Sequence, residues 1–63
     1  MSPLDKRSLA GELVRALRGG RSQTALSRRL GYRSNVVYTW ESGRREPSAS
    51  ELFRLIAALR RDP

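Results

Sequence analysis

Between residues 22 and 43 the sequence reads SQTALSRRLGYRSNVVYTWESG, and this stretch decides the fold. Its first half places three apolar residues at the spacing of one helix face: Ala25, Leu26 and Leu30. Ser22 stands where an N-cap residue is favoured, and Gly31 supplies a stop at which the chain can turn left-handed. The sequence therefore predicts a short helix that begins after Ser22 and ends before Gly31.

The second half predicts another short helix, over residues 34–42. Its apolar residues recur at helical spacing, and Gly43 ends the segment. The glycine turn at residues 30–33 lets this helix cross the first one and project from the surface. If Val37 and Trp40 face the core, the opposite side carries polar or amphipathic groups: Ser34, Asn35, Tyr38 and Thr39. Such groups can read base edges in a major groove about 12 Å wide.

Longer helices are expected on both sides of this pair. Residues 5–18 predict one that starts near Ser2-Pro3, ends at Gly19-Gly20 and carries one apolar face: Leu9, Leu13, Ala16 and Leu17. Ser48 and Glu51 have the spacing of a capping box, which predicts the start of the last helix. The apolar face expected there is wide: Leu52, Phe53, Leu55, Ile56 and Leu59. The fold class is thus all-α, a compact bundle of four short helices, with a fifth left open, in one domain over residues 1–63.

Composition excludes several classes of site. The chain has 63 residues and neither Cys nor His, so a disulfide framework, a zinc finger, a thiol nucleophile and an imidazole base are absent. The acidic residues are scattered among arginines without catalytic spacing, and a bundle of this size offers little pocket. We therefore expect no enzyme, no cofactor, no metal and no small-molecule substrate. No apolar run approaches the roughly 18 residues that span a bilayer, so we expect no membrane contact and a cytoplasmic location.

The charge balance indicates a polyanionic partner. Thirteen Lys and Arg residues stand against six Asp and Glu, which gives a net charge of +7. All of these cations except Lys6 are arginine. Arginine suits bidentate contact with phosphate or guanine, but the same bias also follows from a GC-rich coding sequence. Charge alone leaves nucleic acid and anionic membrane as alternatives.

The chain resembles the Cro/C1 family of helix-turn-helix proteins, the phage-repressor or xenobiotic-response-element family, over residues 22–59. The residues that carry the resemblance are Ser22-Gln23, Leu26, Leu30-Gly31, Val37, Trp40-Glu41, Gly43 and Pro47-Ser48. It implies a lambda-repressor-like bundle whose second and third helices form the motif, residues 22–42. It also implies a prokaryotic or phage transcription regulator, such as a repressor, that binds double-stranded operator DNA at the nucleoid. Family members usually form homodimers through a later region, so this chain is open to being the N-terminal piece of a longer protein.

The resemblance also implies roles for individual residues. Ser34, Asn35 and Thr39 hold the family's base-reading places, and we expect Gln23 and Tyr38, which lies between them, to read bases as well. Gln23 would touch a phosphate or a base edge. The residues expected at the DNA backbone are Arg21, Arg33, Arg44 and Arg45, of which the last two follow the third helix, where the family contacts the neighbouring strand. Phosphate contacts of this kind set position without reading sequence.

Departures from the family pattern carry further expectations. Family members pair an arginine of the first helix with the glutamate that matches Glu41, and a turn two residues shorter here makes Arg18 that partner. Ser27 replaces the usual alanine, and its hydroxyl is expected to bond back to a carbonyl of its own helix. Arg33 stands where a capping residue is common, which leaves Ser34 or water to cap the third helix.

Other functions compete with DNA reading. The runner-up is a protein-interaction module on the same fold, but a docking surface favours clustered apolar side chains, where this helix presents Ser34, Asn35 and Thr39. Single-stranded RNA binding needs several exposed aromatics, and only Tyr32 and Tyr38 stand outside the expected core. Arg28 and Arg29 either flank a phosphate or solubilise the second helix. The arginines expected to be solvated are Arg54, Arg60 and Arg61.

Overall fold

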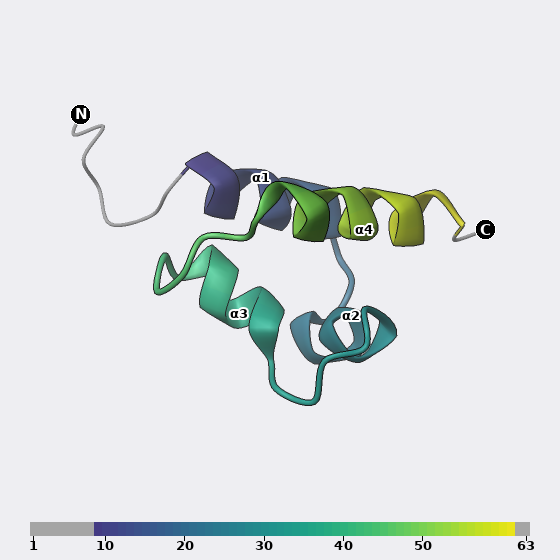
Figure 1. The fold of residues 1–63 in the computed structure, drawn as a ribbon. Helices are drawn as coiled ribbons and strands as arrows, with labels where there is room; N and C mark the ends of the chain where they lie inside the picture. The colour runs from purple at the N-terminus through teal and green to yellow at the C-terminus, as the bar shows by residue number, and fades with distance from the viewer. Residues whose placement is uncertain (1–8, 62–63) are drawn as a thin grey trace.

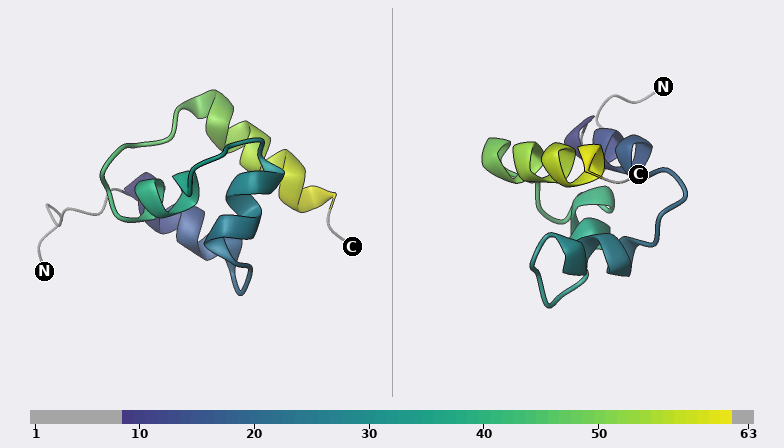
Figure 2. Two further views of the ribbon diagram at one scale, coloured as in Figure 1. Left: turned by 90° about the horizontal axis from the view of Figure 1, so that it is seen from below. Right: turned by 90° about the vertical axis from the view of Figure 1, so that its right-hand side faces the viewer.

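This computed structural model describes residues 9–61 of the chain, and four helices lie within that range. They are α1 (Leu9–Arg18), α2 (Gln23–Arg29), α3 (Val36–Glu41) and α4 (Ala49–Arg60). α1 and α4 pack together on one side of the molecule, and α2 and α3 lie on the other side (Figures 1 and 2). α3 contacts both α1 and α2. The all-α bundle is confirmed, whereas the expected start of the first helix at residues 2–8 lies outside the described residues.

The predicted helix ends are confirmed where a local signal marks them. The Ser22 hydroxyl accepts a hydrogen bond from the Ala25 amide at 3.2 Å and so caps α2. Gly31 has a φ of 95°, a conformation that other residues rarely adopt, and turns the chain toward α3. At α4, Ser48 and Glu51 form both bonds of the capping box, with N···O distances of 3.1 and 2.9 Å.

The core lies where all four helices meet. Its buried apolar residues are Val14, Leu26, Leu30, Val36, Val37, Trp40 and Leu55. Leu26, Leu30, Val37 and Trp40 were expected there, and the structure confirms them. Tyr32 was expected outside the core, and this was wrong: its ring packs edge-to-face on Trp40 with the centroids 5.9 Å apart.

The apolar face predicted for α1 is wrong in part. The helix buries Gly11 and Val14, whereas Leu9 is 89% and Leu13 is 45% exposed. The reason is a close approach to α3 at Gly11, where a β-carbon would lie 2.5 Å from the backbone oxygen of Trp40. Because α1 meets α3 along its glycine side, Leu9 and Leu13 point elsewhere. Hydropathy patterning cannot detect a contact centred on a residue without a side chain.

The expected inward faces of α2 and α4 are also too wide. Ala25 is exposed on α2. Leu55 is fully buried on α4, but Phe53 is 71% and Ile56 is 37% exposed. Among residues 9–61, α4 makes its helix contacts mainly with α1, so a narrower stripe meets the core.

Candidate nucleic-acid interface

α3 presents one polar face to solvent because its other face is fixed in the core. Val36, Val37 and Trp40 are buried, which leaves Tyr38 47% exposed and Thr39 partly exposed. The predicted opposition of apolar and polar faces is therefore confirmed. The helix is shorter than expected, since it begins at Val36 and leaves Ser34 exposed in the preceding turn.

Asn35 is the N-cap of α3. Its Oδ1 atom accepts hydrogen bonds from the Tyr38 amide and from the Ser27 hydroxyl, both at 3.2 Å. The expectation that Ser34 or water caps the helix was wrong, because asparagine reaches the free amides of the first turn. Bidentate pairing with adenine uses the same Oδ1 as its acceptor. The base-reading role of Asn35 stays a prediction, and it now depends on the Nδ2 donor of that side chain.

Ser27 joins α2 to the start of α3. Its side chain is fully buried, and the hydroxyl accepts a hydrogen bond from the Val37 amide at 3.0 Å while it donates to Asn35. The expected bond to a carbonyl of α2 was wrong. The first amides of a helix have no partner within that helix, and α3 begins directly against this hydroxyl. Ser27 thereby fixes how α3 sits on α2.

Arg18, Glu41 and Gln23 form a partly buried network behind α3. Arg18 Nε donates to Glu41 Oε2 at 2.6 Å, and Arg18 Nη2 donates to Glu41 Oε1 at 3.0 Å. These bonds confirm the predicted pair. Gln23 Nε2 also donates to Oε1, at 2.9 Å. Burial by itself raises the pKa of Glu41, but these hydrogen bonds and the positive charges of Arg18 and Arg15 leave that pKa below its usual value. Gln23 is therefore held by its amide nitrogen, and its expected contact with DNA stays a prediction.

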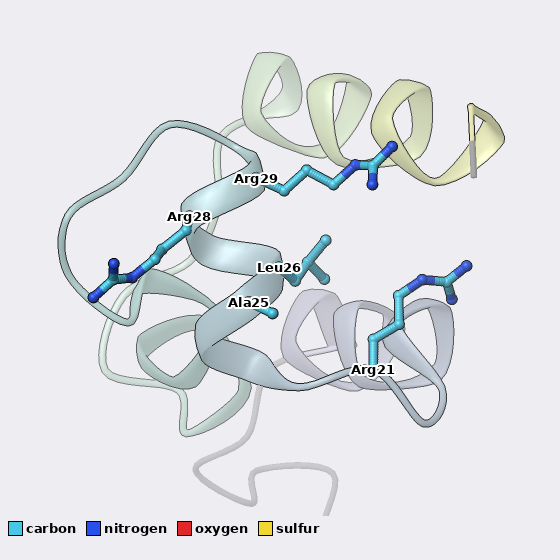
Figure 3. A pocket seen from close by; sticks show the side chains of 5 residues that line it. All are labelled: Arg21, Ala25, Leu26, Arg28 and Arg29. Atoms are coloured by element: carbon cyan, nitrogen blue, oxygen red, sulfur yellow. The ribbon is translucent and has the colours of Figure 1, made fainter. Parts of the chain in front are cut away.

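The arginines predicted at the DNA backbone differ in their surroundings. Arg33 and Arg44 are exposed before and after α3, and neither side chain has a hydrogen-bond partner within residues 9–61. Arg45 Nη2 pairs with Glu51 Oε2 at 3.2 Å. Arg21 lies on the α1 and α4 side of α2, where it lines a pocket with Leu26 (Figure 3). Two of the four predicted cations thus flank α3 directly.

Comparison with known families agrees with this arrangement. Residues 14–63, well over half of the chain, match the model of a helix-turn-helix family of the Cro/C1 type. The chain belongs to the Cro/C1-type helix-turn-helix family. Neither the curated proteins nor the solved structures include a significant match. The family consists of DNA-binding domains without catalytic activity.

Every helix of the Cro/C1-type domain within residues 9–61 is too short or too polar to span a bilayer. In the same range, no group of three or more acidic, His or Cys side chains is arranged to hold a metal ion.

Glu51 holds together the segments that surround the helix-turn-helix of the Cro/C1-type domain. Besides the capping box, its carboxylate accepts from the Tyr32 hydroxyl at 2.5 Å and from Arg45. Arg54 is exposed, as expected, but it also makes contacts that were not foreseen: its Nη2 donates to the Leu30 carbonyl at 2.5 Å and the guanidinium carbon lies 5.7 Å from the Tyr32 ring centroid. The last carbonyls of a helix lack partners within the helix, and Arg54 supplies one for α2.

The pH dependence of the stability of the Cro/C1-type domain is expected to depend on Glu51. Hydrogen bonds from the Ser48 amide, the Tyr32 hydroxyl and Arg45 lower the pKa of Glu51 to about 2. A carboxyl with a lowered pKa in the folded state stabilises that state above its unfolded value, here 4.5, and this contribution is lost as the pH falls toward 2. Unfolding monitored by circular dichroism should show falling stability below pH 4.5. Glu51→Gln should flatten this dependence, and an unchanged pH profile would contradict the assignment.

Proposed function

We propose that this domain is a transcription regulator that binds double-stranded DNA sequence-specifically, with α3 in the major groove. The observation that carries the proposal is that α3 is anchored by a buried face and presents a polar face between two exposed arginines, Arg33 and Arg44. A major groove about 12 Å wide admits an α-helix, and α3 has six residues. The flanking cations are placed to neutralise phosphates on both sides of that groove.

The proposed base contacts differ in chemistry. The Tyr38 ring and the Thr39 methyl group suit a thymine methyl, and the Ser34 hydroxyl donates to or accepts from a base edge. The Thr39 hydroxyl donates to the Asn35 carbonyl at 3.4 Å, so it accepts from a base edge. Asn35 contributes its Nδ2 donor while its Oδ1 caps α3. Gln23 uses its Oε1 because its amide nitrogen is bonded to Glu41.

The proposed backbone contacts are led by Arg33 and Arg44, whose side chains need not break another bond within the described residues. Arg45 completes this side of the interface by exchanging Glu51 for a phosphate. Arg21 is proposed to bind the backbone beyond the start of α2. Each such contact contributes affinity that depends on salt and not on sequence.

Selection from a randomised duplex pool at roughly physiological salt tests the proposal. We expect enrichment of a motif of a few base pairs, and a motif repeated about one helical turn away would support the homodimer that the resemblance implies. A pool that stays unselected would reject sequence-specific reading. The exposed side of α3 would then be assigned to a protein partner, the alternative reading of this fold.

Variants of α3 should separate base reading from backbone contact. On the selected duplex, Tyr38→Ala is expected to cost about 1–3 kcal/mol and to relax the preference at one base pair. Arg44→Gln should weaken binding to all duplexes alike. Fluorescence anisotropy titrations on the selected duplex and on one-position variants measure both effects. Equal losses on every duplex for both variants would reject the base-reading assignment.

Asn35 needs a different substitution because alanine would also remove the cap of α3. Asn35→Ser keeps a capping oxygen and removes only the amide donor. We expect this variant to fold normally and to lose preference at one base pair if the Nδ2 donor reads a base. Unchanged discrimination would leave Asn35 with its structural role alone.

A further inference from the structure

An open, mainly polar groove lies between α1, the start of α2 and α3, next to the exposed face of α3. The residues that line it are Arg15, Arg18, Gln23, Tyr38, Glu41 and Ser42. Tyr38 belongs both to this groove and to the exposed face of α3 that is proposed to meet the bases. A duplex that contacts Tyr38 would therefore bring its backbone to the mouth of the groove.

The charges in the groove do not cancel. The carboxylate of Glu41 is bound by Arg18 through two nitrogens and by the Gln23 amide. Arg15 is exposed, and within residues 9–61 its guanidinium has neither a hydrogen-bond nor an ion-pair partner. The groove thus holds one positive charge in excess. The Ser42 hydroxyl donates to the Thr39 carbonyl at 3.2 Å, so the Arg15 guanidinium and the Tyr38 hydroxyl are the groups here that suit a phosphate oxyanion.

The packing of α1 explains why Arg15 reaches this position. Gly11 and Arg15 are one helical turn apart and so share a side of α1. Gly11 lies directly against the backbone of α3, where a β-carbon would come within 2.5 Å of the Trp40 oxygen. The close approach that only glycine permits brings the next turn of α1, with Arg15, to the edge of α3.

From this arrangement we propose that Arg15 binds a phosphate of the DNA backbone in this groove. The inference rests on the proposed function, since it concerns the same bound duplex. It adds a DNA contact from α1 to the DNA contacts proposed for α2, α3 and the loop after α3. A phosphate held here also positions Tyr38 over its base, because both side chains line the same groove.

The salt dependence of binding tests this contact. The logarithm of the binding constant falls linearly with the logarithm of the salt concentration, and removing one phosphate contact reduces the magnitude of this slope by about 0.9. We expect Arg15→Gln to show this loss on the selected duplex and on an unrelated duplex, with affinity reduced about tenfold at low salt. The matched control is Arg60→Gln, which removes the same charge from an exposed position on α4 and should leave the slope unchanged. Arg15→Lys should retain the slope.

Three outcomes are decisive. A slope for Arg15→Gln that equals that of Arg60→Gln, while the native domain binds, would overturn the Arg15 contact and leave the proposed function standing. Native domain that binds no duplex would overturn the proposed function and the contact with it. A smaller slope for Arg15→Gln alone, in a domain that circular dichroism shows to be folded, supports the contact.

Discussion

The domain is expected to lose about 3 kcal/mol of unfolding free energy when Gly11 is replaced by valine, because no side chain fits between α1 and α3 at this point. A β-carbon there would lie 2.5 Å from the Trp40 oxygen and 3.5 Å from the Glu41 α-carbon. Both are backbone atoms, so the clash is relieved only if the two helices move apart. A single core in a chain of this size rarely supplies more than about 3–5 kcal/mol, and the variant should be largely unfolded.

Alanine at the same position gives a sharper test of the same contact. Intrinsic helix propensity favours alanine over glycine by about 1 kcal/mol, so an open site would be stabilised. We expect Gly11→Ala instead to destabilise the domain by about 1–2 kcal/mol in urea denaturation. Gly20→Ala is the control, because a β-carbon at Gly20 meets no heavy atom within 4 Å. A Gly11→Ala variant as stable as the native domain would contradict the close approach of α1 and α3.

Replacing Arg18 by methionine is the second change with a large expected effect. It leaves the Glu41 carboxylate, whose side chain is 7% exposed, with Gln23 as its only hydrogen-bond donor in the described network. Breaking a fully buried ion pair costs about 3–5 kcal/mol. Because Arg18 is 18% exposed and Gln23 keeps its bond, we expect a loss of about 2–3 kcal/mol. Chemical denaturation at pH 7 measures it.

The pH dependence and a second substitution distinguish this electrostatic cost from lost packing. Without Arg18 the pKa of Glu41 rises, so the penalty of Arg18→Met should shrink as the pH falls through about 4.5. The double variant Arg18→Met/Glu41→Leu should recover most of the lost stability, since it removes the buried charge altogether. If the double variant were no more stable than Arg18→Met at pH 7, the cost would lie in packing and not in the stranded carboxylate.

Helix boundaries in this chain could be predicted because their signals are local. Ser22, Gly31 and the Ser48–Glu51 box each act within a few residues of their position in the sequence. The Arg18–Glu41 pair was also predictable, although its partners are 23 residues apart, because the family resemblance supplied the glutamate and the length of the turn supplied the arginine.

Contacts between segments could not be predicted in the same way. The side of α1 that meets α3 is centred on Gly11, which carries no hydropathy signal. The two hydrogen bonds of the Ser27 hydroxyl depend on where α3 begins. Arg54 and Tyr32 meet only after α4 has packed beside the turn that follows α2. Each of these features depends on tertiary packing, which residue spacing alone does not report.

The candidate site was predictable in outline and not in detail. Burial of Val37 and Trp40 correctly implied that Tyr38 and Thr39 face outward. The capping bond of Asn35 was missed because asparagine and serine are both good caps, and only the start of α3 decides between them. Arg15 gave no motif signal, since its position beside Tyr38 follows from helix packing.

Parallel selections with the native domain and with Tyr38→Ala test most directly whether α3 reads bases. Both proteins would be presented with the same randomised duplex pool at roughly physiological salt, after circular dichroism has shown that both are folded. We expect an enriched motif for the native domain, and for Tyr38→Ala the same motif with its preference lost at one position. Identical motifs for the two proteins, or no motif for the native domain, would contradict base reading by α3.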